Sequence, residues 1–160
     1  MPPGILTPQS LMFILEKEIF RASRYDLPFA ALSFSVVLAK PKKHVPPGTI
    51  THQSVVDSIL EKLTTNVRGA DLAGQLGKNK GVALLPMTSK TESKFALRRH
   101  LRMLNTESVE IKGVPLDVKI AGVATNFEPE SMPDAAAFLK TLSYNLSEMV
   151  ARIKNIHQLV

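Results

Sequence analysis

Two short segments hold the residues of this sequence that could do chemistry, and both are cationic. The segment Gly77–Gly81, GKNKG, carries a lysine on each side of Asn79, and the segment Ala96–Leu104, ALRRHLRML, spaces three arginines over helical turns. Ammonium groups are point charges that hold anions without selecting among them, so Lys78 and Lys80 could retain a phosphate or the acidic patch of a partner. The alternative for Gly77–Gly81 is an ordinary solvated turn, in which Asn79 tolerates a left-handed conformation. The segment Ala96–Leu104 is expected to be a solvated helix face rather than a nucleic-acid reader.

Other kinds of catalytic or binding site are missing from the sequence. The chain has no cysteine, which excludes disulfides, thiolate metal sites and cysteine nucleophiles. Its four histidines lack the spacing of metal ligands, and neither a P-loop nor a dinucleotide-binding glycine motif is present. No serine lies in a nucleophile-elbow pattern, and no aromatic pair on the expected strands matches the stacking platform of RNA-binding modules. We therefore expect no metal site and no nucleic-acid partner.

Length and composition are typical of one cytoplasmic globular domain. A chain of 160 residues with 44% apolar and 21% charged residues can bury a single core, so we expect one domain over residues 1–160. No apolar run approaches the ~18 residues that a membrane-spanning helix needs. The N-terminus, MPPGILTPQS, lacks the basic stretch and cleavage site of a secretion signal, which predicts a cytoplasmic protein. The net charge of +6 favours anionic partners.

Hydrophobic periodicity predicts the elements that position the cationic segments. A first helix carries apolar residues at helical spacing: Leu11, Ile14, Leu15, Ile19 and Phe20. A β-favouring run over residues 29–38 predicts a buried strand, and the segment 40–48, rich in proline and lysine, predicts a loop. A second helix follows its cap, Thr51. The apolar side of this helix consists of Val55, Val56, Ile59, Leu60 and Leu63.

A hairpin and a third helix follow. Residues 72–76 and 82–86 have the pattern of two strands, and the turn between them is predicted at Gly77–Gly81. Ser89 and Glu92 have the spacing of a capping box, in which each side chain accepts from the other residue's amide. The third helix is therefore expected to begin directly after Ser89.

A second hairpin, with its turn at Lys112 and Gly113, and a closing helix after Ser131 and Pro133 complete the chain. One apolar face of that helix contains Phe138, Leu142, Leu146, Met149, Val150 and Ile153. Without the first and last helices, the order is strand, helix, hairpin, helix, strand. This βαββαβ order is the split βαβ plan, an α+β fold with helices on one face of a mainly antiparallel sheet. Because many functions share this plan, the site has to be argued separately.

The segment from Arg68 to Thr88, RGADLAGQLGKNKGVALLPMT, resembles the signature region of the GGDEF family, the bacterial diguanylate cyclases that make cyclic di-GMP. The family pattern, roughly R-x-x-D-L-x-x-x-L-G-G-D-E-F-x-x-L-L-P-x-T, aligns with it without a gap. Only the first of its five signature positions is kept, and these positions are Gly77, Lys78, Asn79, Lys80 and Gly81. Similarity in EIFRASRYDLPFAALSF and VKIAGVAT extends the resemblance over about 120 residues. It implies the GGDEF fold, which resembles that of nucleotidyl cyclases.

The resemblance implies that the carboxylates of a cyclase are missing. Joining two nucleoside triphosphates requires divalent metal held by carboxylates, which neutralises charge on the α-phosphate. In the family's register, the metal carboxylate of the first strand falls near Ser35, and the two signature carboxylates fall at Asn79 and Lys80. The guanine-reading residues are replaced as well, near Lys43 or His44 and at Gln53. Because a lysine repels Mg²⁺ and offers no lone pair, we expect a degenerate signature, no bound Mg²⁺ and a pseudo-enzyme without catalytic residues.

The resemblance also implies that a second site is retained. Arg68 and Asp71 fall in the register of the family's R-x-x-D inhibitory site, which binds cyclic di-GMP away from the catalytic half-site. Arg99 falls where a further arginine from the next helix completes that site. An arginine fork can hold a phosphate or a guanine edge, and an aspartate can accept from guanine N–H groups. The alternative is that Arg68 and Asp71 form a surface ion pair, which usually contributes little.

Three functions remain open at this point. The first is a catalytically inactive GGDEF-like module for signal transduction, in which cyclic di-GMP changes contacts with a partner domain or a second copy. The second is a protein-interaction or dimerisation scaffold that binds no nucleotide. The third is GTP binding without turnover at a basic mouth formed by Lys40, Lys42, Lys43, Lys78 and Lys80.

Overall fold

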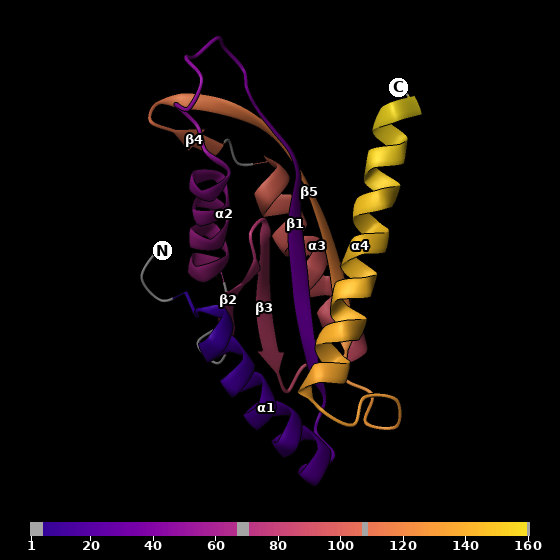
Figure 1. Cartoon of the computed structure of the whole chain (residues 1–160). Helices are drawn as coiled ribbons and strands as arrows, with labels where there is room; N and C mark the ends of the chain where they lie inside the picture. The colour runs from indigo at the N-terminus through magenta and orange to yellow at the C-terminus, as the bar shows by residue number, and fades with distance from the viewer. Residues whose placement is uncertain (1–4, 67–70, 107–108, 160) are drawn as a thin grey trace.

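The computed structural model describes residues 5–66, 71–106 and 109–159 (Figure 1). Helices and strands follow one another in the predicted order, which confirms an α+β fold. The helices are α1 (Pro8–Tyr25), α2 (His52–Asn66), α3 (Lys90–Thr106) and α4 (Ala135–Leu159). The strands are β1 (Phe29–Pro41), β2 (Leu72–Gly77), β3 (Lys80–Pro86), β4 (Val109–Ile111) and β5 (Val114–Asn126). None of the helices in the described ranges combines the length and apolar character that crossing a membrane requires.

One antiparallel sheet contains these strands in the order β2-β3-β1-β5-β4. β1 lies between β3 and β5, so that Phe34 has Gly81 on one side and Gly122 on the other. This central place of β1 is the mark of the split βαβ plan. The predicted turn at Lys112 and Gly113 joins β4 to β5, and both residues have a positive φ, of 52° and 75°.

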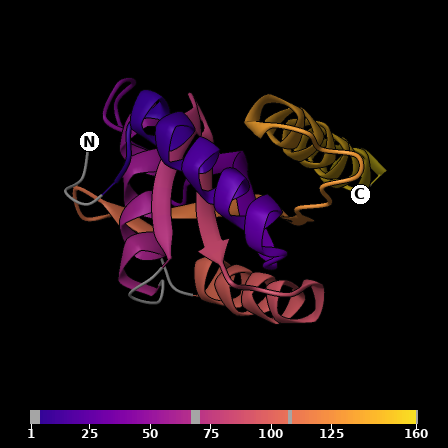
Figure 2. The ribbon, with the colours of Figure 1, turned by 90° about the horizontal axis from the view of Figure 1, so that it is seen from below.

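Helices cover both faces of the sheet, and Figure 2 shows α3 and α4 on opposite sides. Successive side chains of β1 point to opposite faces. Leu32 and Phe34 lie in the core beneath α2 and α3, whereas Phe29 and Ala31 lie in the core beneath α1 and α4. Phe138 of α4 is fully buried there, with its ring centroid 5.5 Å from that of Phe29. The two helices inside the βαββαβ order thus share one face, as predicted, and the two terminal helices cover the other.

The helix starts follow the predicted caps. The Glu92 amide donates to Ser89 Oγ at 3.2 Å, and the Ser89 amide donates to Glu92 Oε1 at 3.1 Å, which confirms the capping box of α3. At the start of α2, the Ser54 amide donates to Thr51 Oγ1 at 3.1 Å. These side chains satisfy amides that have no partner within the helix.

Two predicted apolar faces are only partly buried. In α1, Phe20 belongs to the predicted apolar spacing but is 64% exposed. The buried stripe of α1 consists of Leu11, Leu15, Ile19 and Ala22. In α4, the side chains of Phe138, Leu142 and Leu146 are buried, as predicted. Beyond them, Met149, Val150 and Ile153 are only half-buried, because a groove separates this half of α4 from the sheet.

The turn of the first hairpin is tighter than predicted. Gly77 and Lys80 are paired, so the turn consists of Lys78 and Asn79 alone, and Gly81 lies inside β3. Asn79 does not adopt the left-handed conformation that the solvated-turn alternative allowed. Among the described residues other than glycine, a positive φ occurs at Asp26, Met87 and Lys112. The two lysines of this hairpin therefore differ in setting, one at its tip and one at the start of a central strand.

Candidate functional site

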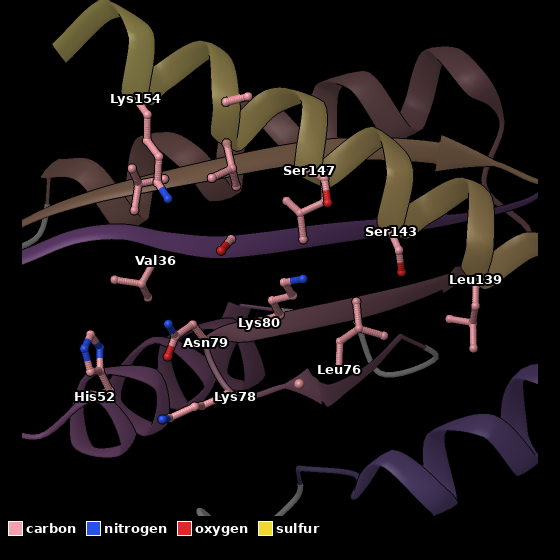
Figure 3. A pocket seen from close by; sticks show the side chains of 16 residues that line it. Val36, His52, Leu76, Lys78, Asn79, Lys80, Leu139, Ser143, Ser147 and Lys154 are labelled. Carbon is pink, nitrogen blue, oxygen red and sulfur yellow. The ribbon is translucent and has the colours of Figure 1, made fainter. Parts of the chain in front are cut away.

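The tip of the β2–β3 hairpin forms one wall of a groove with a volume of about 840 Å³. The opposite wall is α4, and the middle of β1 lies between them (Figure 3). Lys80 points into this groove because Val82, two residues further along β3, lies in the core beneath α1 and α4. The Val36 amide donates to the Asn79 carbonyl at 3.2 Å. This bond ties the tip to β1, so the position of Lys80 is fixed by two strands.

Basic side chains reach the groove from three elements. His52, Lys78, Lys80 and Lys154 line it, and none of the described lining residues is acidic. Three serine hydroxyls are also present, from Ser35, Ser143 and Ser147. Among the described residues, no group of three or more histidines or acidic side chains is placed to hold a metal ion. This donor set can hold an anion, but it offers no carboxylate to Mg²⁺.

On the other face of the sheet, His100 of α3 lies in the core with only 1% of its surface exposed. Its Nδ1–H donates to the Ala96 carbonyl at 2.7 Å, and among the described residues its Nε2 has no partner. The imidazole ring lies 6.2 Å from the Phe34 ring, measured between centroids. Burial lowers the pKa of this imidazole, because removal from water disfavours the charged form. His100 is therefore a neutral core residue near neutral pH.

Comparison by sequence finds no match, either to a family model or to a curated protein. Comparison with solved structures finds matches. The GGDEF domain of FimX from Pseudomonas aeruginosa matches with a TM-score of 0.78 at 11% identity, over 95% of this chain and 94% of that chain. The chain has the fold of GGDEF domains.

Two further GGDEF-fold structures carry a ligand or a partner. The GGDEF domain of DgcB from Caulobacter crescentus, solved in complex with c-di-GMP, matches with a TM-score of 0.69 at 6% identity, over 94% of this chain and 84% of that chain. The diguanylate cyclase SiaD from Pseudomonas aeruginosa, solved in complex with its activator SiaC, matches with a TM-score of 0.68 at 17% identity, over 96% of this chain. This chain spans 57% of the SiaD chain.

The GGDEF fold brings together three positions at which the family's register places acidic residues. Ser35 of β1 pairs with Lys80 of β3, and both line the groove with Asn79. The Oδ1 atom of Asn79 is buried and has no hydrogen-bond partner among the described residues. A hydroxyl, an amide and an ammonium group thus converge where the resemblance implies carboxylates.

The basic mouth that the sequence predicted differs from the one in the structure. Three of its expected lysines are exposed and do not line the groove: Lys40, Lys42 and Lys43. The positive charge of Lys154 on α4 is added instead, and His52 at the start of α2 lines the groove as well. Sequence reasoning missed Lys154, Ser143 and Ser147, because it took this face of α4 for core through Val150. Ser143, Ser147, Val150 and Lys154 lie four, three and four residues apart, and this helical spacing was the available signal.

The second predicted site is described only in part. Arg68 lies outside the described residues. Asp71, directly before β2, is buried, and Arg99 of α3 is exposed. Besides burial, the charge of Arg99 lowers the pKa of His100 and the charge of Asp71 raises it. Asp71 and Arg99 therefore both lie within electrostatic reach of the same buried side chain, on the face of the sheet opposite the groove.

Proposed function

We propose that this chain is a catalytically inactive GGDEF-like regulatory module of a bacterial cytoplasm. One observation carries the proposal: the groove at the signature turn is lined by lysines and contains no carboxylate among its described residues. Phosphodiester formation between two nucleotides requires Mg²⁺ held by acidic side chains. Asn79 and Lys80 stand where the resemblance implies two of these acids, and Ser35 stands near the third position.

Charge alone makes this groove unfavourable for Mg²⁺. At an effective dielectric constant of about 20, two unit charges 4 Å apart interact by about 4 kcal/mol, so a divalent ion beside one ammonium group experiences roughly twice that repulsion. Lys80 has no described acidic partner that would neutralise it. The same charge attracts anions. This supports a groove that has changed from holding Mg²⁺ to holding an anion, rather than one that retains weak cyclase activity.

The regulatory ligand that we assign is cyclic di-GMP, bound through Arg68, Asp71 and Arg99. Guanidinium groups can hold its phosphates or guanine edges through paired hydrogen bonds, and a carboxylate can accept from guanine N–H groups. The proximity of Asp71 and Arg99 to His100 supports a common site. The DgcB domain, which has the same fold, was solved with c-di-GMP bound.

Isothermal titration calorimetry of the full chain with cyclic di-GMP tests the receptor. We expect micromolar binding that Arg68→Ala or Arg99→Ala weakens at least tenfold, because a hydrogen bond to a charged group contributes about 1.5–3 kcal/mol. Arg98→Ala is the matched control, since Arg98 is the exposed neighbour of Arg99 on α3. A flat titration of folded protein contradicts the receptor role. Formation of cyclic di-GMP from GTP and Mg²⁺, followed by chromatography, contradicts inactivity.

A second function, binding of a protein partner without nucleotide, is favoured by the walls of the groove. Val37, Leu76, Leu139 and Val150 line it and are only half-buried. Apolar surface that remains open to water favours a partner that covers it. This function and cyclic di-GMP reception are compatible, because the groove and the Asp71–Arg99 surface lie on opposite faces of the sheet.

A further inference from the structure

The groove between α4 and the β2–β3 tip presents positive charge from two sides. Figure 3 shows Lys154 on α4 and Lys80 on β3 facing the space between these walls, with Lys78 at the tip and His52 near one end. Within the described part of the chain, no carboxylate forms an ion pair with any of these groups. Like charges that face one another across a groove repel, so an anionic occupant is stabilised there.

The groove is long as well as charged. Ser143, Ser147, Val150 and Lys154 line it from successive turns of α4. At 1.5 Å per residue, the helix from Ser143 to Lys154 is about 16 Å long. This length corresponds to about five residues of extended chain at ~3.3 Å per residue. Two hydroxyls at one end and an ammonium group at the other are spaced for a linear ligand.

The lining residues are poorly suited to a nucleotide. No phenylalanine, tyrosine or tryptophan is among the described lining residues, and the one ring among them, the His52 imidazole, lies near one end of the groove. Gln53, at a guanine-reading position of the family's register, donates through Nε2 to Asp57 Oδ1 at 2.7 Å and does not line the groove. Leu76 and Leu139 offer apolar contact instead, on the hairpin and on α4 respectively.

We infer that this groove binds an extended acidic segment of a protein partner, about five residues long at ~3.3 Å per residue, in which pairs of acidic residues alternate with pairs of apolar residues. Successive side chains of an extended segment point to opposite sides, so two adjacent acidic residues can reach Lys80 on one wall and Lys154 on the other, while two adjacent apolar residues cover Leu76 and Val150. The inference deepens the second proposed function, and it rests on the loss of catalysis, because magnesium and GTP would occupy the same space.

Fluorescence anisotropy with labelled octapeptides tests this inference. The probe alternates pairs of glutamates with pairs of leucines, and two comparison peptides replace every glutamate by lysine or every leucine by serine. We expect the glutamate–leucine peptide to bind the full chain with micromolar affinity and both comparison peptides to bind at least tenfold more weakly. The double variant Lys80→Glu with Lys154→Glu is expected to lose at least tenfold in affinity for the first peptide.

The matched control is the double variant Lys90→Glu with Lys94→Glu. It changes net charge equally, and both lysines are exposed on α3, on the opposite face of the sheet. The inference is overturned if this control weakens binding as much as the groove variant does, if the serine peptide binds equally well, or if folded wild-type protein binds none of the peptides. Displacement of the peptide by micromolar GTP identifies a nucleotide site and also overturns it. Synthesis of cyclic di-GMP is scored separately, since it contradicts inactivity itself.

Discussion

The lack of a side chain at Gly81 lets the β2–β3 hairpin pack directly against α2. The variant Gly81→Ala tests how closely the two are packed. A Cβ atom at this position would lie 2.5 Å from Leu60 Cδ2 and 3.5 Å from Leu63 Cδ1. Both leucines are fully buried, so neither can turn aside without moving its neighbours. We therefore expect alanine at this position to overpack the interface between β3 and α2.

The expected loss of stability follows from two opposing effects. Overpacking a filled core typically costs about 1–3 kcal/mol. Replacing a glycine inside a strand by alanine returns roughly 0.5–1 kcal/mol, because the unfolded chain loses freedom. The net expectation for Gly81→Ala is a decrease of about 1–2 kcal/mol in the free energy of unfolding, or roughly 2–8 °C in Tm for a chain of this size. Urea denaturation followed by circular dichroism measures it, provided that the m-value is unchanged.

Gly77→Ala is the matched control in the same hairpin. A Cβ atom there would have only Lys80 Cδ nearby, at 4.0 Å, and Gly77 is not among the described residues with positive φ. This variant should be as stable as the wild type or slightly more stable. The double variant Gly81→Ala with Leu60→Val should recover part of the loss, because the valine side chain is one methylene shorter and no longer reaches the position of Leu60 Cδ2. Equal stability of the two glycine variants would refute the packing argument.

Two further predictions concern the buried histidine and the signature. Burial lowers the pKa of His100, so the imidazole binds a proton more readily in the unfolded chain than in the folded one. The free energy of unfolding should therefore decrease as pH falls below the ordinary pKa of 6.5. Urea midpoints measured from pH 5 to 8 should show this dependence, and His100→Gln should reduce it. Restoring two acids with Asn79→Asp and Lys80→Glu should still yield no cyclic di-GMP from GTP and Mg²⁺ by chromatography, because Ser35 supplies no carboxylate. Robust synthesis by this variant contradicts the assignment of Ser35.

The fold could be predicted from the sequence where one element carries one clear pattern. The apolar side of α2 is buried throughout, at Val55, Val56, Ile59, Leu60 and Leu63. The pattern was ambiguous in α1, where Ile19 and Phe20 are adjacent and both apolar, and only packing against the sheet decides which is buried. In α4 the apolar face continues beyond the core. Periodicity indicates which residues a helix could bury, but it does not show whether another element covers them.

The candidate site was predictable on the hairpin and not beyond it. Lys78 and Lys80 stand between glycines, which marked them in the sequence. The length of their turn was wrong because Gly81 was taken as a turn residue, whereas the structure uses it for close packing. Lys154 comes from a helix that is distant in sequence, and nothing local indicates that it faces Lys80. Only the three-dimensional arrangement brings these charges together.

Gly81 also bears on how the altered signature is to be understood. The family pattern has phenylalanine at this position, but here Leu60 lies where even a Cβ atom would be crowded. The tip is bonded to β1 through the Asn79 carbonyl, and Lys80 pairs with Ser35 across the same strands. The hairpin is thus packed from α2 and held by β1 while its charged residue faces α4. In the proposed anion binding, a lysine held in this way is a fixed binding group, so variants that loosen the hairpin should weaken anion binding before they unfold the chain.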